Sequence, residues 1–487
     1  MTRKTSKKLV VVAAFITSVI IFSSCTGNNN WPQFRGPESN MVVTGKNLPT
    51  EWANDKNVKW TYDFEGYSWS SPIIWEDKVF ITSAIGVKAE PIGIFEPRPE
   101  PRPDTSGAGQ ARPQGQPPQS GAPGAGQGRQ QEPPPPPPPP EKDSSYLQEI
   151  YRWEVTCLDL NTGEVIWKQV AYEGNPKGAI NRGGSSYANE TPVTDGSKVY
   201  AYFGNLGMFC FDMEGKLLWQ KDLGAYSTLR EWGTGSSPVV YQDVVYQLVD
   251  NEVNSFIVAL NAATGEEIWK AAREEKTTYS TPVIWKNSVR TELVAVGKVA
   301  RSYDLKTGEV LWQLKMGGEM SIPSPVTDKD RIYLSNAGGR ENPGTICAVK
   351  AGAEGDITPS EGEMTGTWVE WSNPEAGTGN PTPLVYNGLI YIMAGRGGNM
   401  SCLNAATGKL VYKEKAENVS GCWASPWVAG DNICFMDEKG VTTIIKSGEK
   451  FEVVGQNKLD DRFWASVGVG GDKYVLKGRE KVYCVGL

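Results

Sequence analysis

The 487-residue sequence predicts an all-β protein, an eight-bladed β-propeller with four-stranded antiparallel blades. The first observation is a Ser/Thr-Pro pair that opens seven apolar strands, at Ser71-Pro72, Thr191-Pro192, Ser237-Pro238, Thr281-Pro282, Ser324-Pro325, Thr382-Pro383 and Ser425-Pro426. An eighth copy, without the proline, stands at Ser466-Val467. Five of the seven intervals between successive copies lie between 41 and 46 residues. Four short strands in a period of this length are typical of a propeller blade.

The second and third observations lie inside each repeat. The third strand ends in Asp or Asn, and a Gly follows four residues later, as in Asp159 to Gly163, Asn261 to Gly265, Asp304 to Gly308 and Asn404 to Gly408. Four residues past the Gly a large aromatic residue recurs, at Trp167, Trp219, Trp269, Trp312 and Tyr412. Asx and Gly residues satisfy and permit a tight turn between strands, so this pattern predicts hairpins.

A strand from the N-terminal region is expected to close the ring. Seven outer strands are marked by aromatic residues at Trp167, Trp219, Trp269, Trp312, Trp371, Tyr412 and Phe451. The chain after Ser466 has room for only three strands before Leu487, whereas residues 57–60 end in Trp60 just before the first repeat. Because an unpaired sheet edge invites aggregation, we expect residues 57–60 to supply the missing strand. The predicted propeller therefore spans residues 57–487.

The N-terminus predicts a lipoprotein signal peptide over residues 1–24. Four basic residues precede an apolar run over residues 9–22, which is short for a transmembrane span, and small residues lead to Cys25. This ending is similar to a bacterial lipobox, so Cys25 is expected to carry the lipid and residues 25–56 to form an anchor and N-terminal arm. Thr26 in place of Asp favours the outer membrane within the cell envelope or periplasm.

One segment interrupts the first blade. Residues 86–145 are rich in Pro, Gly and Gln and end in eight consecutive prolines, 133–140. Because no apolar periodicity survives there, the sequence predicts a disordered or polyproline II insertion. It could be a tolerated solvated loop, a docking arm for a proline-recognising partner, or a spacer.

Composition excludes several functions. The net charge of −7 becomes −11 without the signal's four basic residues, as 45 Lys and Arg then face 56 Asp and Glu, so we do not expect nucleic-acid binding. The chain has no His, which removes Ser-His-Asp and Cys-His catalysis, and no cysteine spacing predicts a metal site. Four cysteines share one strand register and are expected to be buried fillers: Cys157, Cys210, Cys402 and Cys484. Cys422 and Cys434 are the one pair whose spacing leaves a disulfide open.

A candidate binding face follows from the repeat. Loops that enter the inner strands of a propeller gather around its axis, and the residues three positions before each Pro (or Val467) are Trp69, Asn189, Gly235, Tyr279, Ile322, Asn380, Trp423 and Trp464. Nearby lie Arg182, Arg230, Trp232, Arg396 and Arg462. Aromatic and Arg side chains suit binding pockets and interface hot spots, but the same rings could simply plug a narrow channel.

The repeat resembles the tryptophan-docking repeat of quinoprotein dehydrogenases, and the opening residues 31–37 and 48–52 are similar to bacterial "PQQ-binding-like" propellers. The same repeat occurs in BamB-type lipoprotein scaffolds of outer-membrane assembly. The dehydrogenase resemblance implies pyrroloquinoline quinone (PQQ) and calcium, held by adjacent disulfide-bonded cysteines, a Trp floor and Glu, Asn and Asp ligands. No two cysteines here are adjacent, and Asn189-Glu190 and Asp460-Asp461 offer only weak matches to those ligands.

The resemblance to BamB-type scaffolds leads us to expect a non-enzymatic, lipid-anchored periplasmic propeller that binds a protein or ligand on its loop-rich face. The predicted partner is an envelope protein, a small molecule or a glycan, and no cofactor, catalytic residue or metal is expected. Two alternatives stay open: a relative of PQQ- and calcium-dependent dehydrogenases, and a carbohydrate- or peptide-binding module. Recovery of the protein with PQQ and calcium, followed by its absorbance spectrum, separates the first alternative from the scaffold.

Overall fold

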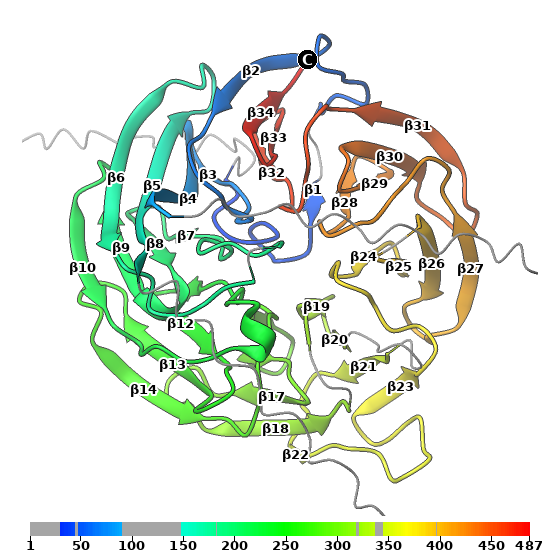
Figure 1. Ribbon diagram of the computed structural model, residues 1–487. Helices are drawn as coiled ribbons and strands as arrows, with labels where there is room; N and C mark the ends of the chain where they lie inside the picture. Colours follow the sequence, from blue (N-terminus) through cyan, green and yellow to red (C-terminus); the bar gives the residue numbers. More distant parts are fainter. Residues whose placement is uncertain are drawn as a thin grey trace, which may run out of the picture.

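Eight four-stranded antiparallel sheets surround one central axis, as the blades of a propeller, in a computed structural model of the chain (Figure 1). The structure describes residues 30–43, 47–89, 148–181, 183–317, 321–336, 344–395 and 397–487. This arrangement confirms the predicted fold class. The predicted signal peptide, Cys25 and the insertion from residue 90 onward lie outside the described residues.

The first four blades use consecutive strands, from the axis outward. Blade one holds β3 (Ile73–Trp75), β4 (Lys78–Lys88), β5 (Ile150–Asp159) and β6 (Val165–Gly174); blade two holds β7 (Val193–Thr194), β8 (Lys198–Tyr202), β9 (Met208–Asp212) and β10 (Leu217–Lys221). Blade three holds β11 (Val239–Tyr241), β12 (Val244–Val249), β13 (Phe256–Asn261) and β14 (Glu267–Ala272); blade four holds β15 (Val283–Lys286), β16 (Thr291–Ala295), β17 (Val299–Tyr303) and β18 (Val310–Lys315). In blade four, β22 (Gly355–Asp356) adds in parallel to the outer edge of β18.

The remaining blades continue the ring. Blade five holds β19 (Val326–Thr327), β20 (Arg331–Ser335), β21 (Ile346–Lys350) and β23 (Val369–Asn373); blade six holds β24 (Leu384–Tyr386), β25 (Leu389–Met393), β26 (Asn399–Asn404) and β27 (Leu410–Lys415). Blade seven holds β28 (Trp427–Ala429), β29 (Asn432–Met436), β30 (Val441–Lys446) and β31 (Val453–Lys458). Two short 3-10 turns, η2 (Gly204–Leu206) and η3 (Leu229–Glu231), lie in loops.

Blade eight is built from both ends of the propeller. Its inner strands are β32 (Gly468–Gly470), β33 (Lys473–Lys477) and β34 (Lys481–Val485), and β2 (Val58–Asp63) pairs antiparallel with β34 as the outer strand. Trp60 stands opposite Cys484, and Figure 1 shows β2 beside the last strands of the chain. The predicted closure by the N-terminal strand is therefore confirmed.

In five of the eight blades a recurring Trp joins the blade to the next, whereas blade six has Tyr412 at this position. Five indole Nε1 groups donate to backbone oxygens of the following blade: Trp60 to Leu160 (2.9 Å), Trp167 to Met213 (3.0 Å), Trp219 to Ala262 (3.2 Å), Trp269 to Leu305 (3.0 Å) and Trp371 to Ala405 (3.1 Å). Each ring lies over the turn Gly of that next blade, where an added Cβ would stand closer than 3.0 Å to the indole. The turn thus needs Gly both for its positive φ and for the approach of the ring.

Two docking positions depart from the repeat. Trp312 donates instead to Glu292 Oε2 in its own blade (2.8 Å), because blade five lacks the Gly turn and its chain runs back along β18 as β22. Phe451 was expected to be the aromatic residue of the outer strand in blade seven, and this was wrong. A bulge in the pairing of β30 with β31 places Gly455, opposite Ile444, at the docking position. Phe451 precedes β31 and packs against Tyr412, with the ring centroids 5.9 Å apart.

The N-terminal arm, defined here as residues 31–43, runs across the axis at the end of the inner strands. Trp31 forms a bridge to Ile74 in blade one, and the Pro32 oxygen accepts from Thr194 N in blade two (2.9 Å). β1 (Val42–Val43) then adds in parallel to β28 of blade seven. The arm therefore ties together inner strands from distant blades. A search of the described residues finds no helix with the length and apolar character of a membrane span.

Blade one is longer than its neighbours on one face. β4 and β5 remain paired out to Lys88 and Ile150, so residues 86–88, at the start of the predicted insertion, belong to a strand. Tyr67 forms an isolated bridge with Ala84 on the same side. The two described ends of the insertion therefore emerge next to the loop that carries Trp69.

Candidate functional site

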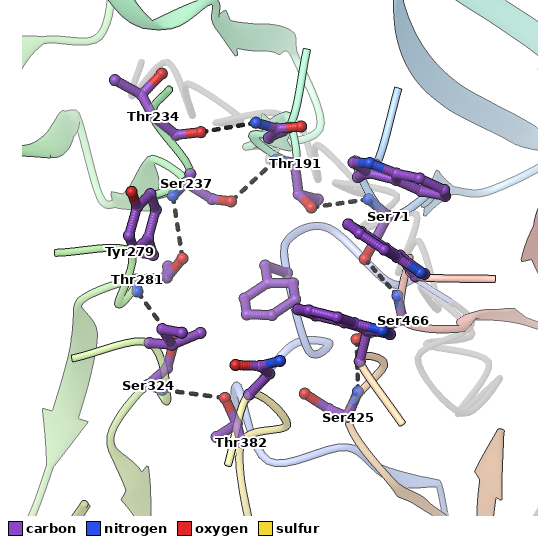
Figure 2. Close-up of a pocket in the computed structure, with 18 of the residues that line it drawn as sticks. Ser71, Thr191, Thr234, Ser237, Tyr279, Thr281, Ser324, Thr382, Ser425 and Ser466 are labelled. Carbon is purple, nitrogen blue, oxygen red and sulfur yellow. Dashed lines mark hydrogen bonds between the residues drawn. The ribbon is translucent and has the colours of Figure 1, made fainter. Parts of the chain in front are cut away.

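The Ser and Thr residues of the repeat form a hydrogen-bonded ring around the axis (Figure 2). Seven of the eight hydroxyl oxygens, all but Ser425 Oγ, accept from the backbone N–H at the same position of the preceding blade among the described residues, with N to O distances of 2.9–3.0 Å. The seven donor–acceptor pairs are Ser71–Thr191, Thr191–Ser237, Ser237–Thr281, Thr281–Ser324, Ser324–Thr382, Ser425–Ser466 and Ser466–Ser71. The ring fixes the eight inner strands at a common height, which sets the loops before them in one plane.

A cavity of about 490 Å³ lies on the axis directly above this ring. All eight residues at the position three before the Pro (or Val467) line it: Trp69, Asn189, Gly235, Tyr279, Ile322, Asn380, Trp423 and Trp464. Trp232 also lines the cavity. We call the side of the propeller on which these loops lie the cavity face. The repeat register therefore brings residues that are up to 395 positions apart into one site.

One wall of the cavity is a stack of three indoles from adjacent blades. The Trp464 ring of blade eight lies between Trp69 of blade one (centroids 4.4 Å apart, planes 19° apart) and Trp423 of blade seven (4.2 Å, 20°). The outer indoles are held at their N–H groups, because Trp69 Nε1 donates to Gly184 O (3.0 Å) and Trp423 Nε1 to Glu438 Oε2 (3.2 Å). The rings therefore pack against each other, yet all three remain half-exposed to an open cavity.

The floor of the cavity comes from the N-terminal arm. Phe34 is among the lining residues, and next to it Arg35 is 1% exposed and donates to the backbone oxygens of Pro383 (2.9 Å) and Pro325 (3.4 Å). Burial lowers the pKa of the Arg35 guanidinium to about 9. Sequence reasoning missed Phe34, because it lies outside the repeat and has no register to place it. The only signal was an unusually aromatic segment, Trp31 to Phe34, ahead of the blades.

The polar groups of the cavity are amides, hydroxyls and indole N–H groups. Asn189 is turned to the wall, where Nδ2 donates to Thr234 O (2.9 Å) and Ser185 Oγ (3.3 Å) (Figure 2). Tyr279 lies over Gly235, where an added Cβ would come within 3.2 Å of the ring. The Asn380 amide and the N–H groups of Trp464 and Trp232 make no hydrogen bond to the described residues. Within the described part of the chain, these three side chains have hydrogen-bonding groups left for a ligand.

The two predicted arginines that the structure describes, Arg230 and Arg462, do not line the cavity. The exposed Arg230, in η3 beside the cavity, lies over the Trp232 ring, with 5.5 Å from the guanidinium carbon to the ring centroid. The backbone oxygen of Arg462 accepts from Arg479 N (2.8 Å), and the side chain is not among those that line the cavity. Arg182 and Arg396 lie outside the described residues.

The structure shows the surroundings of two carboxylates that the sequence offered as weak matches to calcium ligands, Asp461 and Glu190. Asp461 accepts from the backbone N–H groups of Arg462 (2.6 Å), Arg479 (3.1 Å) and Lys481 (3.1 Å), so it holds the β33–β34 turn. Glu190 is 2% exposed and does not line the cavity. Burial raises the pKa of Glu190 to about 7, although a hydrogen bond with Thr234 acts in the opposite direction.

The described residues do not fit PQQ and calcium. PQQ carries three carboxylates, which need cationic or hydrogen-bonding partners, and calcium needs several oxygen ligands including carboxylates. The side chains that line the cavity in the described part of the chain include no Lys, Arg, Asp or Glu. Nor do the described ranges contain a cluster of three or more Cys, Asp or Glu side chains placed to hold a metal.

The cysteines that follow Cys25 are buried. Cys157, Cys210, Cys347, Cys402, Cys422, Cys434 and Cys484 are all free thiols, so the Cys422–Cys434 pair forms no disulfide. Burial raises the pKa of the Cys157, Cys210, Cys402 and Cys484 thiols to about 12, so these groups are protonated fillers of the sheets.

Comparisons with known proteins agree with the repeat. A family model described as "Outer membrane protein assembly factor BamB" matches residues 209–450. The chain is 22% identical over 298 residues to tetrathionate hydrolase of Acidithiobacillus ferrooxidans, which covers 57% of this chain and 52% of that protein. It is 25% identical over 186 residues to BamB of Moranella endobia and 27% over 197 residues to BamB of Yersinia pestis, each covering 38% of this chain and 44% of the relative. The chain thus spans about half the length of the curated relatives it matches.

Solved structures show the same fold at low identity. BamB from Moraxella catarrhalis superposes with a TM-score of 0.50 and 13% identity, over 69% of this chain and 91% of that chain. A europium-containing methanol dehydrogenase superposes with a TM-score of 0.59 and 11% identity, over 95% of this chain and 99% of that chain. Together with the family match, these likenesses confirm the resemblance predicted from the repeats: the chain is an eight-bladed propeller of PQQ-like repeats, similar to BamB and, in fold alone, to methanol dehydrogenase.

Proposed function

We propose that this protein is a lipid-anchored scaffold of the bacterial cell envelope that holds a partner on its cavity face without catalysing a reaction. The observation that carries the proposal is the cavity itself, where six of the eight inner-strand loops present a half-buried aromatic or amide side chain around one opening. Such groups bind well, whereas the chain has no His to act as a general base. The similarity to BamB, named as an outer membrane protein assembly factor, supports an envelope partner.

The proposed anchor would place the cavity face away from the membrane. Asn30 Oδ1 accepts from Glu76 N (2.7 Å) in the β3–β4 turn, which lies at the opposite end of β3 from Ser71 and the cavity. Cys25 precedes Asn30 by five residues, a span of at most about 18 Å when fully extended. A lipid on Cys25 would therefore hold the turn face near the bilayer. Replacing Cys25→Ser should move the protein from the membrane to the soluble fraction, and a wild-type protein that is already soluble would contradict the anchor.

Crosslinking in the native envelope tests the scaffold. A photo-crosslinking amino acid at Arg230, on the rim of the cavity, should capture a partner that mass spectrometry can identify. The matched control is the same amino acid at Asp243, an exposed residue in the β11–β12 turn of blade three on the opposite face. Adducts that are equally strong at both positions, or absent at Arg230, would argue against a partner on the cavity face.

The competing proposal is a relative of PQQ- and calcium-dependent dehydrogenases. The likeness to methanol dehydrogenase over 95% of the chain supports this proposal only through the fold, and the uncharged cavity lining argues against it. Purified protein mixed with PQQ and calcium should show no bound quinone absorbance after gel filtration if the scaffold proposal holds. Stoichiometric quinone that stays with the protein would favour the dehydrogenase relative instead.

A further inference from the structure

The cavity is closed at one end. Phe34 lies at its floor, and the arm that carries Phe34 is fixed on both sides of the axis: Trp31 pairs with Ile74, and the Met41 oxygen accepts from Val428 N (2.9 Å). Trp31, Arg35 and Met41 are 3%, 1% and 0% exposed, so the arm is packed into the propeller rather than laid over it. A ligand can therefore enter only from the cavity face, and only the end of a longer molecule could fit inside.

The lining is aromatic and uncharged in the described residues. Six aromatic side chains contribute: Phe34, Trp69, Trp232, Tyr279, Trp423 and Trp464. The remaining polar side chains are Asn, Ser and Thr, which cannot neutralise an ion. Burying a charged ligand group without a counter-charge is unfavourable, so the described part of the lining favours a neutral ligand. The volume of about 490 Å³ lies within the usual range of small-molecule sites, about 300–1,000 Å³.

Free hydrogen-bonding groups in the cavity exclude a purely apolar ligand. The Asn380 amide can both donate and accept, and the indole N–H groups of Trp464 and Trp232 can donate, yet none of them has a partner in the described residues. A hydrocarbon would cover these groups and leave them unsatisfied, which is unfavourable. The ligand that matches is a ring with apolar C–H faces for the aromatic side chains and hydroxyl edges for the amide and N–H groups.

We propose that the cavity binds the end of a neutral oligosaccharide, one or two pyranose rings deep. This rests on the proposed binding role of the cavity face, and it names the ligand class of that site. A pyranose has apolar faces and hydroxyl groups that both donate and accept, so it can satisfy the aromatic walls and Asn380 together. Arg230 lies at the mouth, over Trp232, where the rest of a glycan chain would leave the cavity.

Titration of sugars into the detergent-solubilised full-length protein tests the proposal. The probes are maltotriose, cellotriose and tri-N-acetylchitotriose, with trigalacturonic acid as the charged counterpart, and the readouts are calorimetry and Trp fluorescence. At least one neutral trisaccharide should bind and change the fluorescence of the stacked indoles, at least tenfold more tightly than trigalacturonic acid. Failure of all three neutral probes to bind at millimolar concentration, or equal binding of the acid, would overturn the proposal.

Variants locate the site. Asn380→Ala should weaken the bound sugar at least tenfold without changing the melting temperature, because the amide has no partner in the described residues. Asn432→Ala, at the start of β29 beside the β28–β29 turn on the opposite face, is the matched control and should bind as the wild type does. Unchanged affinity in Asn380→Ala would show that the sugar binds elsewhere. Crosslinks at Arg230 without sugar binding would contradict the oligosaccharide proposal and still support the scaffold proposal. Sugar binding without a protein adduct would support the oligosaccharide proposal and argue against a protein partner.

Discussion

At the scale of single residues, Glu190 shows how burial in the cavity wall changes an acid. The side chain lies behind Asn189, is 2% exposed, and has one carboxylate oxygen, Oε1, without a hydrogen-bond partner in the described residues. Burial disfavours the charged form and raises the pKa from the ordinary 4.5 to about 7. Near neutral pH this residue is therefore about half protonated, whereas an exposed Glu would be ionised.

The raised pKa of Glu190 predicts a pH-dependent stability. Between pH 4.5 and about 7 the folded protein holds a proton that the unfolded chain releases, so the contribution of Glu190 is favourable at low pH and is lost as pH rises through 7. A difference between 4.5 and 7 corresponds to about 3 kcal/mol. The free energy of unfolding of Glu190→Gln minus that of the wild type should therefore grow by about 3 kcal/mol from pH 4.5 to 8. Urea unfolding at both pH values checks this, and parallel pH profiles would contradict it.

The hydroxyl ring gives a second residue-scale prediction. Ser237 N donates to Thr281 Oγ1 (3.0 Å) in a buried position, so Thr281→Val leaves that N–H without an acceptor. An unsatisfied buried donor costs about 1–3 kcal/mol, and we expect a loss of that size in the free energy of unfolding. Thr281→Ser keeps the acceptor and should lose less than the Val variant. Equal losses in the two variants, measured by denaturant unfolding, would show that the hydrogen bond contributes little.

At the scale of elements, the blades were predictable and their exceptions were not. Ser/Thr-Pro pairs, Asx-Gly turns and docking Trp residues are each local signals that recur, so the sequence predicted strand order and the position of the cavity residues. Phe451 misled because the signal at blade seven is weak: the docking position there is Gly455. The next blade, blade eight, has no Gly turn for a docking residue to cover, since its third and outer strands, β34 and β2, are not consecutive in sequence. Instead Trp52 is buried there: its ring centroid lies 5.5 Å from that of Tyr474, and its backbone N–H donates to Asn457 Oδ1 (3.0 Å).

The arm and the choice of ligand could not be predicted for a physical reason. Phe34 reaches the cavity through contacts between the arm and distant blades, such as Arg35 to Pro383, which span 348 positions and leave no periodic pattern. The sequence also left open whether the aromatic rings fill the channel or bind a ligand. The structure shows both features: three indoles stack on each other, and a cavity of about 490 Å³ remains beside them.

The insertion in blade one gives a prediction at the element scale. Its flanking strands β4 and β5 pair as far as Lys88 and Ile150, so the hairpin is complete before the Pro-rich sequence begins. Deleting residues 90–140 should therefore change the free energy of unfolding by less than about 1 kcal/mol, since doubling a loop's length is worth only about 0.6 kcal/mol. Denaturant unfolding checks this. A deletion variant that unfolds without a cooperative transition would show that the segment packs on the propeller.

At the scale of the whole molecule, the N-terminal region has three structural tasks. Its arm forms the floor of the cavity, Trp52 fills the place of a docking residue, and β2 completes blade eight. All three lie within about 40 residues of the proposed lipid site at Cys25. A force on the proposed lipid anchor would therefore act both on the seam of the ring, where β2 pairs with β34, and on the cavity floor. We therefore expect the stability of the ring to depend strongly on the seam where β2 pairs with β34.

Trp60 tests that idea. It is 9% exposed, its Nε1 donates to Leu160 O, and its ring covers Gly163, which repeats the contacts of Trp269 with Leu305 and Gly308 in mid-ring. Truncating a buried aromatic residue costs about 3–5 kcal/mol, so each Trp→Ala variant should lower the unfolding midpoint. Trp60→Ala should lower it at least as much as Trp269→Ala and should also aggregate more, because β2 and β34 are not joined by a hairpin and release of β2 exposes the edge of β34. Thermal unfolding with light scattering compares the two variants. A Trp60→Ala protein that is more stable than Trp269→Ala, with no added scattering, would mean that the arm and Trp52 hold the seam closed without the docking ring.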